Sequence, residues 1–306
     1  MNILSHGKLV TALQYFTDRV EDYWHILYPL CDPDKRKGDP FLYFYDLSRK
    51  AIDFDGQFTE DGIYLFKGYD GKWHLHALEI AQYALACWMA WRKTKEKHWL
   101  KAALRQCDWL VSHQAENGAW YIEHKNPKYN DLPSPWVSGM AQGLAISALI
   151  RAYLFSNESR YLEAAMHSAV FLEKSIADGG VKRDFSQRFI YEEYPREALS
   201  GVLNGYISSV LGIYELSLHQ KDFKKLFQMN LANLKKILPL YDNGYWSLYA
   251  LDGTLSSGFY HRYVITQLKA MEMFDNFFKM YSLRFESYLN NPVFVCKALY
   301  KKMRSR

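Results

Sequence analysis

"SPWVSGMAQGLAISALI", residues 134–150, contains no charged side chain. Its Ser, Gln and Gly residues alternate with apolar residues at helical spacing, which predicts a helix buried in a protein core. A transmembrane helix needs about 20 consecutive apolar residues, and the polar residues leave this stretch short of that requirement. The stretch therefore predicts a core helix of a soluble protein.

One polar position of this helix recurs along the chain. Gln142 aligns with Gln82 of "IAQYAL", Asn204 of "VLNGYI" and Gln267 of "VITQLK", at successive spacings of 60, 62 and 63 residues. Turns with Gly close to Trp recur with it, in "DGKW" (70–73), "NGAW" (117–120) and "NGYW" (243–246), and "DGGV" (178–181) is a degenerate copy. We infer an internal repeat with one helical hairpin per unit.

The chain from residue 74 onward is expected to be mainly α. Helical patterns cover about 76–93, 96–113, 136–155, 158–175, 198–218, 221–237, 259–279 and 282–303. Four hairpins of this kind predict an α/α barrel, in which inner helices face one another and outer helices wrap them. The recurring amides Gln82, Gln142 and Asn204 are then expected to line a central cleft and bind substrate, although a satisfied core amide explains such a residue equally well.

The first 70 residues predict a different arrangement. "GKLVTALQYFTDRVEDYWHILY" predicts an amphipathic helix at about 7–28. "FLYFYDL" (41–47) and "DGIYLF" (61–66) predict two short strands because they are aromatic-rich and too short for helices. We therefore expect an N-terminal helix and β-hairpin arm at 1–70, packed on an α/α-barrel catalytic domain at 71–306.

Composition limits the function classes. With 306 residues and 49% apolar content the chain can form one large core, and a net charge of +5 without a basic, aromatic-flanked run argues against nucleic-acid binding. Aromatic residues make up 17%, which suits a core, a large interface or a surface that covers sugar rings.

The cellular location is predicted from the cysteines and from the sequence at the two ends of the chain. The four cysteines show no metal-binding spacing and predict reduced thiols, and "MNILSHGKLVTALQYF" lacks the apolar core of a signal peptide. We expect a soluble cytoplasmic protein without a transmembrane segment. The basic tail "CKALYKKMRSR" is compatible with contact with an anionic membrane surface.

Several motifs occur in the order found in one known family. "SGMAQGLAISALIRAYL" (138–154), "YEEYP" (191–195), "VLNGY" (202–206), "LPLYDNG" (238–244) and "YHRYVITQL" (260–268) closely resemble the catalytic domain of D-glucuronyl C5-epimerases. Those enzymes convert glucuronate to iduronate within heparosan or heparan-type chains. The resemblance covers roughly residues 70–280 and implies an α/α barrel, no organic cofactor, and catalysis by tyrosines and a glutamate.

The resemblance also implies catalytic residues. Glu193 and Tyr194 match functional positions, Tyr260 matches a catalytic tyrosine, and Tyr249 matches a further tyrosine. Burial of Glu193 in an aromatic cleft would raise its pKa toward neutrality, which suits a residue that must both remove and return a proton.

A cation must neutralise the substrate carboxylate, but Asp252 occupies the place where the resemblance implies an arginine. Arg262, Arg183, Arg188 and Arg196 are the nearest candidates, because a guanidinium binds a carboxylate at two points. His261 of "YHRY" is included as a substrate-binding residue. The expected partner is thus an anionic, glucuronate-containing polysaccharide, and a homodimer stays open.

Other interpretations remain at this stage. A polysaccharide lyase starts with the same C5 proton abstraction, a glycan-binding protein would explain the aromatics, and a glycoside hydrolase would need Asp242 or Glu79 as a second carboxylate beside Glu193. Glu192 and Glu193 could form a solvated turn. His74 and His76 have the spacing of a metal pair, but no third ligand is suggested, so no metal is expected.

Overall fold

The computed structural model describes residues 12–17, 28–68 and 70–304, so the helix predicted at 7–28 lies mostly outside the described residues. Two short helices, α2 (Pro33–Gly38) and α3 (Ser48–Ile52), precede the main helical region. The long described helices that follow are α4 (Ala77–Thr94), α5 (Lys97–Ser112), α6 (Gly139–Ser156), α7 (Ser159–Leu172), α8 (Leu203–His219), α9 (Lys224–Ile237), α10 (Gly258–Met271), α11 (Asn276–Leu289) and α12 (Pro292–Arg304).

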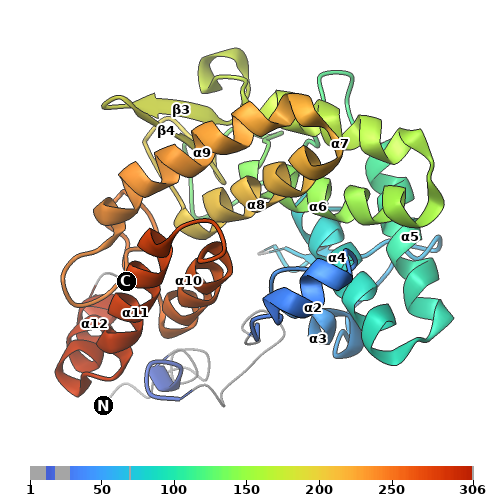
Figure 1. The fold of residues 1–306 in the computed structure, drawn as a ribbon. Helices are drawn as coiled ribbons and strands as arrows, with labels where there is room; N and C mark the ends of the chain where they lie inside the picture. The colour runs from blue at the N-terminus through green and yellow to red at the C-terminus, as the bar shows by residue number, and fades with distance from the viewer. Residues whose placement is uncertain (1–11, 18–27, 69, 305–306) are drawn as a thin grey trace.

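These helices form hairpins that build a ring. Each even-numbered helix from α4 to α10 packs against the helix that follows it, and α6 packs between α4 and α8 while α8 also contacts α10. Figure 1 shows α5, α7, α9 and α11 on the outside of the ring, with α4, α6, α8 and α10 toward its centre. The predicted α/α barrel is confirmed.

Glycines bring two inner helices close together. A Cβ atom added at Gly212 of α8 would lie 2.3 Å from the carbonyl oxygen of Gly143 in α6, and one added at Gly143 would lie 2.4 Å from the Cα of Ser209. Real Cβ atoms do not approach that closely, so only glycine permits this α6–α8 spacing. The small residues of "MAQGLA" thus serve helix packing.

The C-terminal part contains three helices, α10 to α12, where the sequence predicted two at 259–279 and 282–303. The predicted boundaries are wrong because two local stop signals lie inside those ranges. The carboxylate of Asp275 accepts a hydrogen bond from Phe277 N at 2.8 Å and so caps the start of α11. Pro292 then begins α12 after the pair Asn290–Asn291.

The segment "FLYFYDL" is not the strand that the sequence predicted. Its described hydrogen bonding includes one isolated bridge, between Tyr45 and Leu30, and the segment packs under the inner helices. Arg151 of α6 donates hydrogen bonds to the carbonyl oxygens of Phe41 and Leu42, and the Tyr45 hydroxyl lies 2.8 Å from that of Tyr263 in α10. Its aromatic composition therefore reflects burial against helices.

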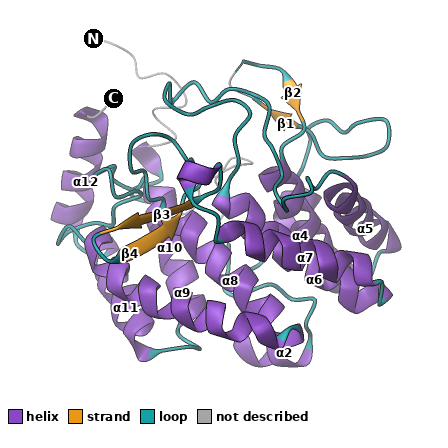
Figure 2. Cartoon of the chain, turned by 90° about the horizontal axis from the view of Figure 1, so that it is seen from above, coloured by secondary structure: helices purple, strands orange, loops and turns teal. Residues whose placement is uncertain are grey.

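Two small hairpins complete the described fold. β1 (Phe66–Lys67) pairs antiparallel with β2 (Trp73–His74), so "DGIYLF" contributes only its last residue to a strand. β3 (Lys182–Phe185) pairs antiparallel with β4 (Arg188–Tyr191), which the sequence analysis missed. In Figure 2 both hairpins stand out among the loops that cover the helices. The β3–β4 turn positions carry positive φ at Ser186 and Gln187, without the Asn-Gly signal that marks such turns.

Candidate active site

A cavity of about 940 Å³ opens at the N-terminal ends of the inner helices. Each inner helix contributes a residue from its first turns, namely Glu79 and Gln82 of α4, Met140 of α6, Asn204 of α8 and Tyr260 of α10. Helix N-termini carry partial positive charge, so four of them directed at one cavity favour an anionic ligand there.

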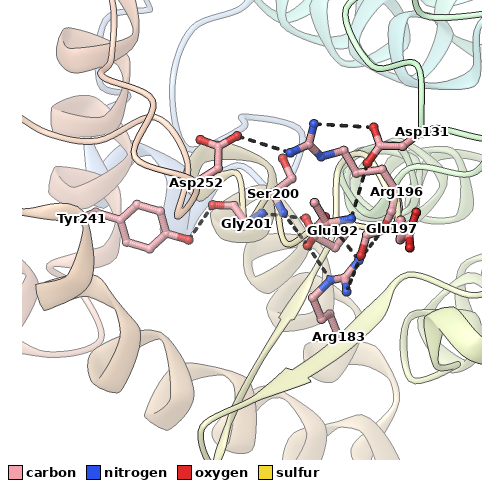
Figure 3. A network of polar contacts seen from close by, with 10 residues as sticks. Asp131, Arg183, Glu192, Arg196, Glu197, Ser200, Gly201, Tyr241 and Asp252 are labelled. Carbon is pink, nitrogen blue, oxygen red and sulfur yellow. Dashed lines mark hydrogen bonds and ion pairs between the residues drawn. The ribbon is translucent and has the colours of Figure 1, made fainter.

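The adjacent residues Glu192 and Glu193 have opposite surroundings. They follow directly after β4, which ends at Tyr191. Glu192 is fully buried away from the cavity, where its carboxylate accepts hydrogen bonds from Arg183 Nε at 2.9 Å, Ser200 N at 3.1 Å and Gly201 N at 2.7 Å (Figure 3). Glu193 lines the cavity.

The backbone amides that donate hydrogen bonds to Glu192 explain why α8 begins later than predicted. The amides of Ser200 and Gly201 bind its carboxylate, and the hydroxyl of Tyr241 donates to the carbonyl oxygen of Gly201 at 2.7 Å. Residues 198–202 are therefore held in a non-helical conformation, and α8 starts at Leu203. This network fixes the loop that carries Glu193 and Tyr194.

Glu193 is 5% exposed, and its Oε2 atom has no hydrogen-bond partner among the described residues. Burial raises the pKa of this carboxyl from 4.5 to about 7, opposed by a hydrogen bond with Tyr194 and by the charge of Lys128, and reinforced by the nearby Glu79. A carboxyl with a pKa near 7 exchanges protons readily at neutral pH.

The predicted tyrosines form one cluster around this carboxyl. Tyr194 interacts with Glu193 and Tyr249, and the ring centroids of Tyr249 and Tyr260 are 4.8 Å apart. Burial is the largest cause, and the neighbouring Glu193 the next, that raises the pKa values of Tyr194 and Tyr249 well above 10. Both phenols are therefore neutral near pH 7 and can donate hydrogen bonds.

The recurring amides divide into two groups, so the expectation that all of them face the cleft needs correction. Gln82 and Asn204 line the cavity. Gln142 is fully buried outside it, where its side chain is hydrogen-bonded to the Ser168 hydroxyl of α7 at 2.6 Å. Gln267 donates to the Asn204 carbonyl oxygen at 3.1 Å. The interpretation as a satisfied core amide therefore holds for Gln142, while Gln267 is buried with its Oε1 atom unpartnered among the described residues.

The four arginines predicted as cation candidates lie outside the cavity lining, namely Arg183, Arg188, Arg196 and Arg262. Arg183 binds Glu192, and Arg196 lies between Asp131 and Asp252 at 3.7 and 3.8 Å (Figure 3). Arg188 and Arg262 donate to the backbone oxygens of Ser186 and Tyr15. These guanidinium groups hold the loops in place around the site.

His261 is fully buried and structural. Its Nδ1 atom lies 2.7 Å from the Ser247 hydroxyl, its Nε2 atom lies 3.0 Å from the Phe285 carbonyl oxygen, and its ring stacks on Trp246 at 3.8 Å. Burial lowers its pKa to about 3, so the imidazole is neutral. His261 lies outside the cavity lining, and its predicted contact with substrate stays a prediction.

Sequence analysis missed most of the cavity's charged and aromatic lining. Lys50 of α3 and Lys128 lie in the wall, and so do His76, His124 and Trp136. The ring of Trp136 is 5.6 Å from that of Tyr194 and 5.8 Å from that of His76. Glu79, which the sequence analysis named only as a second carboxylate for a hydrolase, precedes Gln82 by three residues and shares its helix face. Lys50 gives no comparable local signal.

Two further expectations concern metals and membranes. Among residues 12–17, 28–68 and 70–304, no group of three or more His, Cys, Asp or Glu side chains is arranged to hold a metal ion. His74 instead contacts Asp70 at 3.0 Å, and His76 faces the cavity. The same residues include no helix that is long and apolar enough to cross a membrane.

The fold and the cavity define the class: an α/α-barrel protein with a carboxyl group, phenols and lysines in its central cavity. Among solved structures, the cellobiose 2-epimerase from Spirochaeta thermophila shares this fold, with a TM-score of 0.52 and 13% identity over 92% of this chain and 72% of that one. The family model described as "D-glucuronyl C5-epimerase C-terminus" matches residues 113–287. The chain belongs to this family.

Two curated relatives each match part of the chain. A D-glucuronyl C5-epimerase from Caenorhabditis elegans is 33% identical over 177 residues, which is 52% of this chain and 28% of the nematode protein. An uncharacterized protein from Methanocaldococcus jannaschii is 27% identical over 194 residues, covering 56% of this chain and 62% of that protein. The chain thus matches less than two thirds of either relative's length.

Proposed function

We propose that this protein is a uronyl C5-epimerase that converts D-glucuronate to L-iduronate within a heparosan-type polysaccharide. The observation that carries the proposal is the position of Glu193, with a pKa of about 7, in one cavity with Tyr194, Tyr249 and Tyr260. Membership of the epimerase family supports the same reaction.

The proposed reaction needs two proton transfers. One acid/base group takes the C5 proton, the electron pair of the C–H bond moves into the adjacent carboxylate, and a second group returns a proton to the opposite face. Glu193 serves one face and Tyr260 the other. Each typically contributes about 10²–10⁴-fold to the rate, while Tyr194 and Tyr249 donate hydrogen bonds.

Aromatic and imidazole rings form the proposed binding wall for the sugar rings. Trp136, His76 and His124 line the same cavity, and burial lowers the pKa values of the two histidines, that of His76 to about 3. Neutral rings of this kind stack on sugars and exchange hydrogen bonds with hydroxyl groups. The homodimer and the cytoplasmic location stay predictions.

One other reaction has a specific observation in its favour. Glu79 lines the cavity with Glu193, and burial raises its pKa to about 7. Two carboxyl groups in one cavity are what a glycoside hydrolase requires. The other candidate, Asp242, lies 2.7 Å from Arg284 and outside the cavity lining.

The first experiment is incubation with unsulfated and N-sulfated heparosan in deuterated water, followed by NMR at uronate C5. Epimerisation predicts deuterium at C5, new iduronate signals and intact chains. Unsaturated uronate ends would make the protein a lyase, new reducing ends would make it a hydrolase, and the absence of any exchange would refute the proposal.

Adjacent glutamates offer a matched pair of variants for this assay. Glu193→Gln should lower C5 exchange by roughly 10²–10⁴-fold without loss of stability, because it removes a carboxyl with an unpartnered oxygen. Glu192→Gln should lower the free energy of unfolding by on the order of 3 kcal/mol, because it breaks a buried pair. Urea denaturation measures that loss, and retained exchange in Glu193→Gln would contradict the proposed role.

A further inference from the structure

The proposed epimerisation requires a cation beside the substrate carboxylate, and the described arginines near the motifs are engaged elsewhere. Arg183 binds Glu192, and Arg196 lies between Asp131 and Asp252. Asp252 itself occupies the position where the family resemblance implies an arginine. Lysines line the cavity instead, from several segments. The question is which of them meets the reacting uronate.

Lys50 is distinguished from the other lining lysines by burial. It is 3% exposed and lies on α3, which packs directly against α4. Lys128 and Lys67 also line the cavity but are exposed to solvent. A charge removed from water interacts more strongly with a bound carboxylate than one in solvent, because water screens the exposed charge.

The surroundings of Lys50 connect it to the proposed acid/base group. Its charge acts on Glu79, and Glu79 in turn acts on Glu193. Its Nζ atom lies 6.0 Å from the ring centroid of Tyr28, which also lines the cavity. A buried lysine therefore lies in the same charged cluster as the carboxyl proposed to move the C5 proton.

We propose that Lys50 binds the carboxylate of the reacting uronate and stabilises the negative charge that develops there when the C5 proton leaves. This inference rests on the proposed function for its catalytic part and on the cavity alone for its binding part. Lys50 and Glu79 both precede residues 113–287, the range that the family model matches, so the segment before that range supplies a substrate-binding residue.

The test compares binding of heparosan oligosaccharides with binding of the same oligosaccharides after their carboxylates have been reduced to alcohols. Calorimetry should give wild-type protein a preference for the carboxylated form. Lys50→Met should reduce that preference by roughly ten- to a hundred-fold, the range for losing a hydrogen bond to a charged group. Lys50→Arg should retain most of it.

Matched controls separate charge from structure. Lys72→Met removes an exposed lysine outside the cavity and should leave the preference unchanged. Lys50→Gln provides a second removal variant if the methionine variant does not fold. An unchanged preference in the folded Lys50 variants, or no preference in wild-type protein, would overturn the inference.

Failure of the proposed function gives a different result. If wild-type protein shows no C5 exchange but a Lys50-dependent preference for carboxylated oligosaccharides, epimerisation is refuted and the binding role of Lys50 stands. If exchange occurs, Lys50→Met should lower kcat as well as raise KM, because charge develops in the transition state. A change in KM alone would remove the catalytic part of the inference.

Discussion

At the residue scale, Glu192 and Glu193 differ in role although they are adjacent and chemically identical. Glu192 accepts hydrogen bonds from Arg183 and two backbone amides, so its carboxylate stabilises a loop. Glu193 is equally shielded from water, but its Oε2 atom has no hydrogen-bond partner among the described residues. Burial raises the pKa of Glu193 to about 7, although a hydrogen bond with Tyr194 and the charge of Lys128 oppose it, and this pKa suits Glu193 to proton transfer.

Burial of two cavity carboxyls predicts a dependence of stability on pH. The pKa values of Glu79 and Glu193 are raised from 4.5 to about 7, so between these values the folded protein binds more protons than the unfolded chain. The contribution to the free energy of unfolding is therefore full below pH 4.5 and is lost as the pH rises through about 7.

Urea denaturation of wild-type protein and of a Glu79→Gln, Glu193→Gln double variant measures this contribution. The difference in free energy of unfolding between the two proteins should change between about pH 5 and pH 8, in favour of the double variant at the higher pH. A difference that is the same at both pH values would contradict the raised pKa values.

At the element scale, the parallel inner helices bring distant motifs to one end of the barrel. "MAQGLA", "VLNGYI" and "YHRY" are far apart in sequence, but each lies in the first turns of an inner helix. Tyr260 N donates to the capping Ser257 hydroxyl at 3.2 Å, which fixes the turn that carries the tyrosine. The helical repeat in the sequence is thus enough to predict that the N-terminal ends of the inner helices lie together.

Gly212 provides a test of the inner-helix packing. Gly212→Ala should lower the free energy of unfolding by about 1–3 kcal/mol, because the added Cβ would overlap the Gly143 carbonyl oxygen. Gly38→Ala is the matched control, since a Cβ at Gly38 meets no atom within 4 Å. Thermal or urea denaturation measures both, and equal stability of the two variants would contradict this packing.

At the scale of the whole molecule, the distribution of charge says more about ligand binding than the net charge of +5 does. Helix N-termini and lysines from separate segments surround the cavity, while Arg183 and Arg196 bind carboxylates that lie outside its lining or at its rim. An anionic polymer would therefore be attracted to one end of the barrel.

Binding of heparosan should accordingly weaken as salt rises. Between about 50 and 500 mM salt we expect at least a several-fold loss of affinity, because the screening length shortens to a few ångströms. The carboxyl-reduced polymer is the control and should show little change. Equal salt dependence of the two polymers, measured by calorimetry, would argue against charge recognition.

The α/α barrel could be predicted from the sequence because helical periodicity is local, and the resemblance of the motifs to the epimerase family implied the tyrosines and the glutamate that line the cavity. It missed the β3–β4 hairpin, whose turn is formed by Ser186 and Gln187. The division near residue 70 stays a prediction. Three roles could be read from the structure alone: Gln142 packs in the core, Arg183 binds Glu192, and Lys50 lines the cavity. Those roles depend on which distant segments pack together, and no local pattern records the packing.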